Sequence, residues 1–74
     1  MLYTTQQLGQ LIRQTRQQLG FTQKDLALTS GTGLRFIVEL EKGKPTCQLD
    51  KTLIVLQTLG IKINLTIPNL SLEK

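Results

Sequence analysis

Hydrophobic and polar positions along the chain follow two different periods. Between residues 4 and 60 the aliphatic side chains recur every three or four positions, which is the spacing of amphipathic helices. The segment IKINLTI, residues 61–67, instead alternates, because its isoleucines and leucine fall on one face and Lys62, Asn64 and Thr66 on the other. A period of two indicates a half-buried strand. The pattern therefore predicts an all-α domain followed by a single C-terminal strand.

Capping residues and glycines divide the helical part into four segments. The predicted N-caps of the first three helices are Thr4, Thr22 and Thr32, and the first two can be completed by Gln7 and Asp25. The glycines predicted to end the four helices are Gly20, Gly31, Gly43 and Gly60. The third helix should run to about residue 42 and the fourth from about residue 48 to 59. The leucines expected on the buried side of the fourth helix are Leu49, Leu53, Leu56 and Leu59.

The chain has the length of one small domain, which we expect to span residues 1–74. Its expected parts are a helical core at residues 4–60, a strand at 61–67 and a tail at 68–74. A core of this size contributes only a few kcal/mol net, so small domains usually need a further stabilising device. The chain has no histidine and a single cysteine, Cys47, which excludes an internal disulfide and a His/Cys zinc site. Oligomerisation is the stabilising device that remains.

Composition narrows the function classes. With no histidine, five carboxylates and one thiol, the sequence offers no acid–base or nucleophile constellation, so we expect no enzyme, no metal and no cofactor. The N-terminal stretch MLYTTQQLGQ lacks the features of a secretory signal. The longest aliphatic run, residues 53–56, is far too short to cross a membrane, so a cytoplasmic protein is expected. A net charge of +4 modestly favours polyanionic partners.

The most informative stretch is QKDLALTSGTGLRFIVELEK, residues 23–42. Two short helices should meet there at a tight turn centred on Gly31, and the small Ala27 lets them cross at close range. This stretch resembles the helix-turn-helix unit of phage repressor and Cro proteins. Residues 4–60 as a whole resemble their domain family, the Xre or Cro/C1 type. A plain helical hairpin with glycine caps is the alternative interpretation.

The outward face of the third helix is the candidate for reading DNA. If Ile37 and Leu40 point inward, the outward stripe contains Arg35, Val38, Glu39 and Lys42, with Leu34 on its flank. The alternative is an ordinary solvated face, on which Arg35 and Glu39 form only a weak ion pair. In the family that the sequence resembles, this is the recognition helix in the major groove. The resemblance therefore implies base contacts by Leu34, Arg35, Val38 and Glu39.

The same resemblance implies further roles on either side of that helix. Gln23, at the start of the second helix, is expected to contact a phosphate with support from the helix N-terminus. Lys42 and Lys44, near the end of the third helix, should also reach phosphates. Arg16 and Glu41 match a pair that ties the first helix to the third, and we interpret them as structural.

The C-terminal strand points to a narrower group. Most members of the Xre type continue with a fifth helix, whereas this chain more closely resembles the HipB-like antitoxins, which end in a strand. The matching positions are Tyr3, Gln7 and Leu8, the run RFIVELEKGK at residues 35–44, and the leucine–glycine pair that ends at Gly60. This resemblance covers nearly the whole chain.

An apolar strand without a neighbour is an aggregation hazard, so it needs a cover. The resemblance implies that the strand pairs with its copy in a second subunit, which gives a homodimer with an intersubunit sheet. The residues expected at this dimer interface are Ile61, Ile63, Leu65 and Ile67. A strand donated by a different protein is the alternative.

Three functions follow as hypotheses. The first is a DNA-binding, HipB-like antitoxin that represses its own toxin–antitoxin operon at a palindromic operator on double-stranded DNA and associates with a HipA-like Ser/Thr kinase toxin. The second is a stand-alone helix-turn-helix repressor without a toxin partner. The third is a protein-interaction module that keeps the fold without the DNA contacts.

Overall fold

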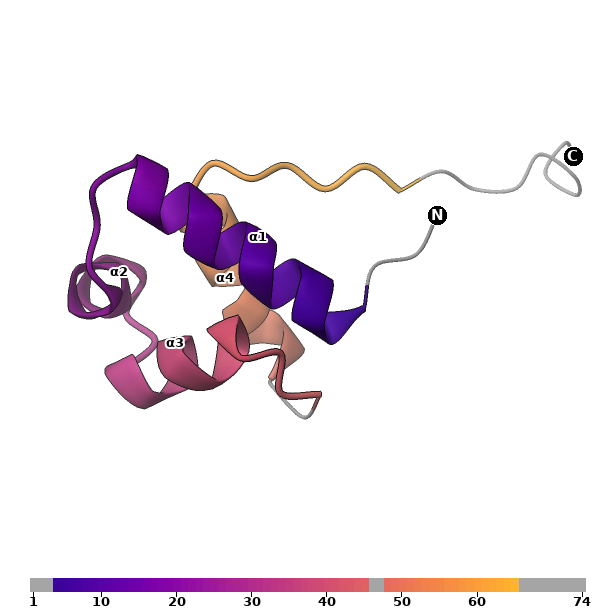
Figure 1. Cartoon of the computed structure of the whole chain (residues 1–74), viewed down its shortest axis with the longest axis horizontal. Helices are drawn as coiled ribbons and strands as arrows, with labels where there is room; N and C mark the ends of the chain where they lie inside the picture. Colours follow the sequence, from indigo (N-terminus) through magenta and orange to yellow (C-terminus); the bar gives the residue numbers. More distant parts are fainter. Residues whose placement is uncertain (1–3, 46–47, 66–74) are drawn as a thin grey trace, which may run out of the picture.

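The computed structural model describes residues 4–45 and 48–65, and these contain four helices and no strand (Figure 1). The helices are α1 (Thr5–Gln18), α2 (Gln23–Ser30), α3 (Leu34–Glu41) and α4 (Leu49–Thr58). The predicted helical fold with a helix-turn-helix pair is thereby confirmed. None of these four helices combines the length and the apolar character that crossing a bilayer requires.

Two of the predicted caps are present as full capping boxes. The Thr4 hydroxyl accepts from the Gln7 N–H at 3.0 Å, and the Thr4 N–H donates to the Gln7 side chain at 2.9 Å. Thr22 and Asp25 exchange the same two bonds at the start of α2, each at 3.0 Å. The hydrogen bond from the Thr22 N–H is the main reason why the pKa of Asp25 lies below its usual value. Both helix starts therefore follow from local sequence.

The predicted cap of α3 by Thr32 is wrong. The N-cap is Gly33, whose φ of +92° suits glycine and hardly any other residue, and it makes no side-chain cap bond. Thr32 is buried instead, and its hydroxyl lies 2.9 Å from the Ser30 hydroxyl, which donates to the Leu26 carbonyl. Thr32 is therefore part of the turn between α2 and α3. Helix α3 begins one residue later than predicted, with Gly33 as its N-cap.

All four helices contribute to one hydrophobic core. The buried apolar residues are Ile12, Leu26, Ala27, Ile37, Leu40, Val55, Leu56 and Leu59. Helix α3 packs against both α1 and α2, and α2 also packs against α4. Burying the aliphatic stripes in this way supplies the main driving force for folding, at about 25 cal/mol per Å² of apolar surface removed from water.

Two glycines allow α1 and the end of α3 to approach very closely. Gly9 is buried in α1, and a Cβ atom there would lie 2.6 Å from the carbonyl oxygens of Leu40 and Glu41. A Cβ atom on Gly43, just after α3, would lie 2.7 Å from the Cα of Gln6. Since side chains do not fit at such distances, both positions require glycine.

The buried side of α4 differs from the prediction in its first half. Leu56 and Leu59 are buried as expected, but Leu49 and Leu53 are 70% and 45% exposed. Their places in the core are taken by Val55 and by Thr52, whose hydroxyl is satisfied by the Gln48 carbonyl at 2.8 Å. Residues 53–56 are all aliphatic, so the sequence allows either of two faces of α4 to be the buried one. The buried Thr52 was not predicted because the prediction considered apolar residues only.

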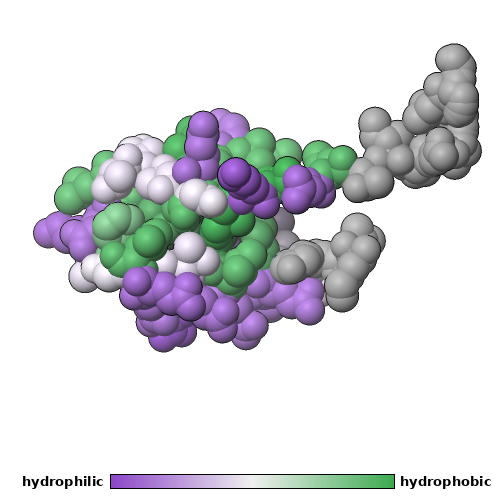
Figure 2. Space-filling view, turned by 90° about the horizontal axis from the view of Figure 1, so that it is seen from above, coloured by the Kyte–Doolittle hydropathy of each residue, from purple (hydrophilic) through white to green (hydrophobic). Residues whose placement is uncertain are grey.

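Beyond α4 the described chain continues as residues 61–65, which run without regular structure on the side of α1 away from α3 (Figure 1). Ile61 packs against the core, whereas Ile63 and Leu65 are 49% and 87% exposed. Seen from above, hydrophobic surface covers the middle of the molecule and continues along this segment (Figure 2). The predicted strand has no partner within the described chain, and its last two residues, 66–67, lie outside it, so the intersubunit sheet stays a prediction.

Candidate nucleic-acid interface

The turn between α2 and α3 has the tight geometry expected around Gly31. Gly31 has a φ of +73°, and the N–H groups of Gly31 and Thr32 both donate to the Ala27 carbonyl, at 2.9 and 3.2 Å. Ala27 itself is buried at the crossing of the two helices. The turn sets the direction of α3 relative to α2, and therefore sets which side chains of α3 face outward.

Helix α3 is amphipathic in the register that the sequence predicts. Ile37 and Leu40 are buried in the core. On the opposite side the Arg35 side chain is 91% exposed, Leu34 is 47% exposed and Lys42 is exposed. The two other members of the predicted stripe, Val38 and Glu39, are half-buried. An outward arginine between aliphatic neighbours can offer hydrogen bonds to guanine and methyl contacts to thymine.

Glu39 lies between two cations on this surface. Its Oε2 is 3.5 Å from Arg35 Nε and 3.3 Å from Lys44 Nζ. Such exposed ion pairs contribute about 0–1 kcal/mol, so they hold the side chains only loosely. Lys44, predicted to contact phosphate, thus lies beside the outward face of α3.

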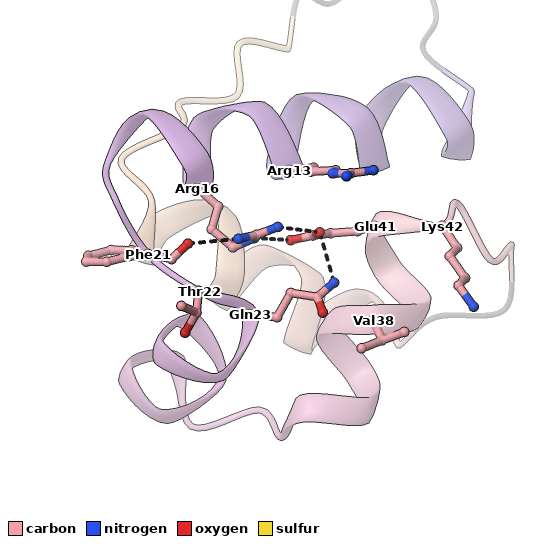
Figure 3. Close-up of a pocket in the computed structure, with 8 residues that line it drawn as sticks. All are labelled: Arg13, Arg16, Phe21, Thr22, Gln23, Val38, Glu41 and Lys42. Atoms are coloured by element: carbon pink, nitrogen blue, oxygen red, sulfur yellow. Dashed lines mark hydrogen bonds and ion pairs between the residues drawn. The ribbon is translucent and has the colours of Figure 1, made fainter.

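A buried carboxylate joins α1, α2 and α3 behind this surface (Figure 3). Glu41 accepts two bonds from the Arg16 guanidinium, at 2.6 and 3.1 Å, and one from the Gln23 side-chain amide at 3.1 Å. Arg16 also donates to the Phe21 carbonyl at 2.8 Å. The ion pair suggested by the sequence is therefore present. In addition, it orients Gln23, a residue for which the sequence suggested only a phosphate contact.

A surface cavity of about 450 Å³ opens over this network. It is lined by Arg13, Arg16, Phe21, Thr22, Gln23, Val38, Glu41 and Lys42 (Figure 3). Two of the predicted phosphate contacts, Gln23 and Lys42, and one predicted base contact, Val38, therefore share one cavity. Lys44, Leu34, Arg35 and Glu39 do not line it.

Arg13 is the residue that reasoning from the sequence did not single out. It lies on α1, three positions before Arg16, and its exposed side chain reaches the edge of the same cavity (Figure 3). Residues three apart on a helix share a face, so the spacing from Arg16 was the available signal. Three cations and one carboxylate line the cavity, which gives its lining a net charge of +2.

Comparisons with known proteins agree with this geometry. A family model described as a helix-turn-helix domain matches residues 9–67. An uncharacterized HTH-type transcriptional regulator, y4mF of Sinorhizobium fredii, is 49% identical over 65 residues, which cover 88% of this chain and 86% of that relative.

Two solved structures have the same fold. They are a complex of a HipB variant with an O2 20mer and a HipB–O4 20mer complex, each with a TM-score of 0.80 and 28% sequence identity. Each match covers 90% of this chain, and 93% and 94% of the respective HipB chains. The resemblance to HipB and related regulators is thus confirmed at the level of fold. Since the family model also matches most of the sequence, the chain belongs to the helix-turn-helix domain family.

Proposed function

We propose that this protein is a sequence-specific DNA-binding transcriptional regulator that acts as a homodimer on a palindromic site. The observation that carries the proposal is the outward face of α3. Arg35 is almost fully exposed there, and the leucine beside it is partly exposed. The opposite face of α3 is buried in the core, which fixes the helix in this orientation. The likeness in fold to HipB, whose structures are complexes with the O2 and O4 20mers, supports DNA binding by this chain.

The finer part of the proposal is the biological setting. We infer a HipB-like antitoxin component that represses its own operon and associates with a HipA-like Ser/Thr kinase toxin. Its support is the fold shared with HipB over nine-tenths of the chain. A gene for a HipA-type kinase beside the gene for this protein, and co-purification of the two products, are the expected findings.

A stand-alone transcriptional regulator without a toxin partner is the second candidate. It is favoured by the 49% identity to a protein described only as an HTH-type transcriptional regulator, which exceeds the 28% identity to HipB. Absence of a kinase gene beside the gene for this protein, together with binding to its own promoter, would favour this second candidate.

The test of DNA reading uses Arg35→Ala, with Glu39→Ala as the matched variant from the same ion pair. A guanidinium bound to guanine O6 and N7 discriminates by about 1–3 kcal/mol, so Arg35→Ala should weaken promoter binding by about that amount per half-site. Because Arg35 is 91% exposed, the thermal unfolding midpoint should stay nearly unchanged. Binding titrations on the native promoter duplex and on a scrambled duplex give the measurement.

The two duplexes separate the possible roles of Arg35. A loss confined to the promoter duplex supports a base contact. Equal losses on both duplexes would make Arg35 a phosphate contact, and no loss on either would remove it from the site. If both variants bind the promoter like the unaltered protein, the Arg35–Glu39 pair is an ordinary surface ion pair.

A further inference from the structure

We propose that Arg13 of α1 is a further ligand of the DNA backbone, at the cavity between α1, α2 and α3 that also holds the expected phosphate contacts Gln23 and Lys42. The inference rests on the proposed DNA-binding function and extends it, because it adds a residue from the first helix to the DNA contacts. Arg13 lies on the α1 side of Glu41, Lys42 lies beyond Glu41 at the end of α3, and Gln23 approaches Glu41 from α2 (Figure 3).

The charges at the cavity favour an anion. Within residues 4–45 and 48–65, Glu41 is bound by Arg16, whereas neither Arg13 nor Lys42 takes part in an ion pair. Two cations thus flank the opening without a carboxylate to neutralise them. The one acidic group of the lining already accepts three hydrogen bonds from Arg16 and Gln23. Its charge is therefore largely compensated, and it does not repel an anion strongly.

Hydrogen-bond donors converge on the same place. Gln23 and Lys24 are the first two residues of α2, where backbone N–H groups have no acceptor within the helix. The Gln23 amide nitrogen donates one proton to Glu41 at 3.1 Å, and its second proton remains for another acceptor. The guanidinium of Arg13 adds donors in a planar fork that matches phosphate oxygens.

The position of the cavity identifies the phosphate as part of DNA. Val38 and Lys42 belong both to the lining and to the outward stripe of α3 that carries Arg35. If this stripe enters the major groove, the adjoining cavity and Arg13 lie at the edge of the groove, where the DNA backbone runs. A small phosphorylated metabolite would need a more enclosed site with apolar walls, and this cavity is open and polar.

The experiment compares Arg13→Gln with Lys62→Gln. Both variants remove one positive charge, but Lys62 lies on the C-terminal segment, on the side of α1 away from α3 (Figure 1). Binding to a mixed-sequence duplex of about 20 base pairs is measured as a function of salt concentration. Losing one phosphate contact should make the log–log slope less steep by about 0.9 per bound copy, so affinity should fall about threefold less between about 50 and 200 mM salt.

Arg13→Lys keeps the charge and should retain the full slope, as should Lys62→Gln, while Arg13→Gln should make the slope less steep by about 0.9 per bound copy. Far-UV circular dichroism confirms that each variant is folded, which we expect because both side chains are exposed. An unchanged slope for Arg13→Gln, or equal changes for Arg13→Gln and Lys62→Gln, would overturn the assignment of Arg13. If the unaltered protein itself shows no salt-dependent DNA binding, the proposed function fails instead.

Discussion

Glu41 is the residue on which the three helices next to the proposed DNA surface converge. It is buried at the end of α3 and accepts bonds from Arg16 of α1 and Gln23 of α2. A buried ion pair adds little net stability when it is complete, because taking both charges out of water costs about as much as the pair returns. Its value here is that it fixes the side chains of three helices in one arrangement.

We predict that Glu41→Ala destabilises the fold by about 3–5 kcal/mol, because it leaves the Arg16 charge buried without a partner. The double substitution Arg16→Met with Glu41→Leu should recover most of this loss, since no charge is then buried. Glu39→Ala, which removes only exposed ion pairs, should cost less than about 1 kcal/mol. Chemical denaturation of the three variants provides the free energies of unfolding. A double variant that is no more stable than Glu41→Ala would contradict this role of the pair.

At the residue scale, the sequence identified the pair of Arg16 and Glu41 but not the neighbours of the pair. The pair was predictable because Arg16 and Glu41 match a pair of positions in the family that the sequence resembles. The bond from Gln23 to Glu41 depends on the angle between α2 and α3, which no local pattern encodes. Arg13 was missed because a cation on an exposed helix face is usually only a solvated side chain.

At the scale of the helices, the close crossing of α1 and α3 requires a glycine within α1, a residue that disfavours the helix itself. Glycine within a helix costs roughly 0.5–1 kcal/mol relative to alanine, so Gly9 weakens α1 considered alone. The crossing requires it, because the backbone carbonyls of Leu40 and Glu41 occupy the space of a side chain. This is a case where tertiary packing overrides helix propensity, and it is also why periodicity alone did not mark Gly9.

We expect Gly9→Ala to destabilise the domain by about 1–3 kcal/mol or more, because α1 must move away from the end of α3. Helix propensity alone would give the opposite result, a gain of about 0.8–1 kcal/mol. Gly20→Ala is the control, since a Cβ there meets nothing within 4 Å and its φ of +81° accounts for any loss. The free energies of unfolding decide between the two effects. A more stable Gly9→Ala variant would show that the crossing is not tight.

The helix starts at Thr4 and Thr22 were predictable because a capping box is completed within four residues. The rotation of α4 was not, because both its faces carry leucine and isoleucine. Leu49, Leu53 and Ile54 remain exposed on the described chain. The helices packed around α4 decide which of its faces is buried. The sequence pattern of α4 alone does not show how those helices are placed.

On the scale of the whole molecule, apolar surface is left on α4 and on the C-terminal segment. Ile63 and Leu65 are exposed in the single chain, so their substitution by glutamate should not disturb the helical core. We predict that Ile63→Glu with Leu65→Glu gives a folded monomer, whereas the unaltered protein is a dimer at micromolar concentration. Sedimentation equilibrium and circular dichroism measure assembly and folding separately.

As the control for added charge, Asn64→Glu places one carboxylate on the polar side of the same segment and should leave the dimer intact. The unaltered protein should also show a thermal midpoint that rises with protein concentration, because association stabilises the folded state. A double variant that remains a dimer would mean that the subunits meet elsewhere.

The arrangement of these surfaces also bears on how relatives of this protein would diverge. Helix α3 lies on one side of α1 and the C-terminal segment on the other (Figure 1). If α3 reads DNA and the C-terminal segment pairs the subunits, as proposed, then after a gene duplication a few exchanges along the outward stripe of α3 would redirect one copy to a new operator without touching the core or the pairing surface. The two copies would then still assemble with each other, and the mixed dimers would match neither palindrome. To keep two such regulators from forming mixed dimers in one cell, changes at the C-terminal segment would then be needed as well as changes on α3.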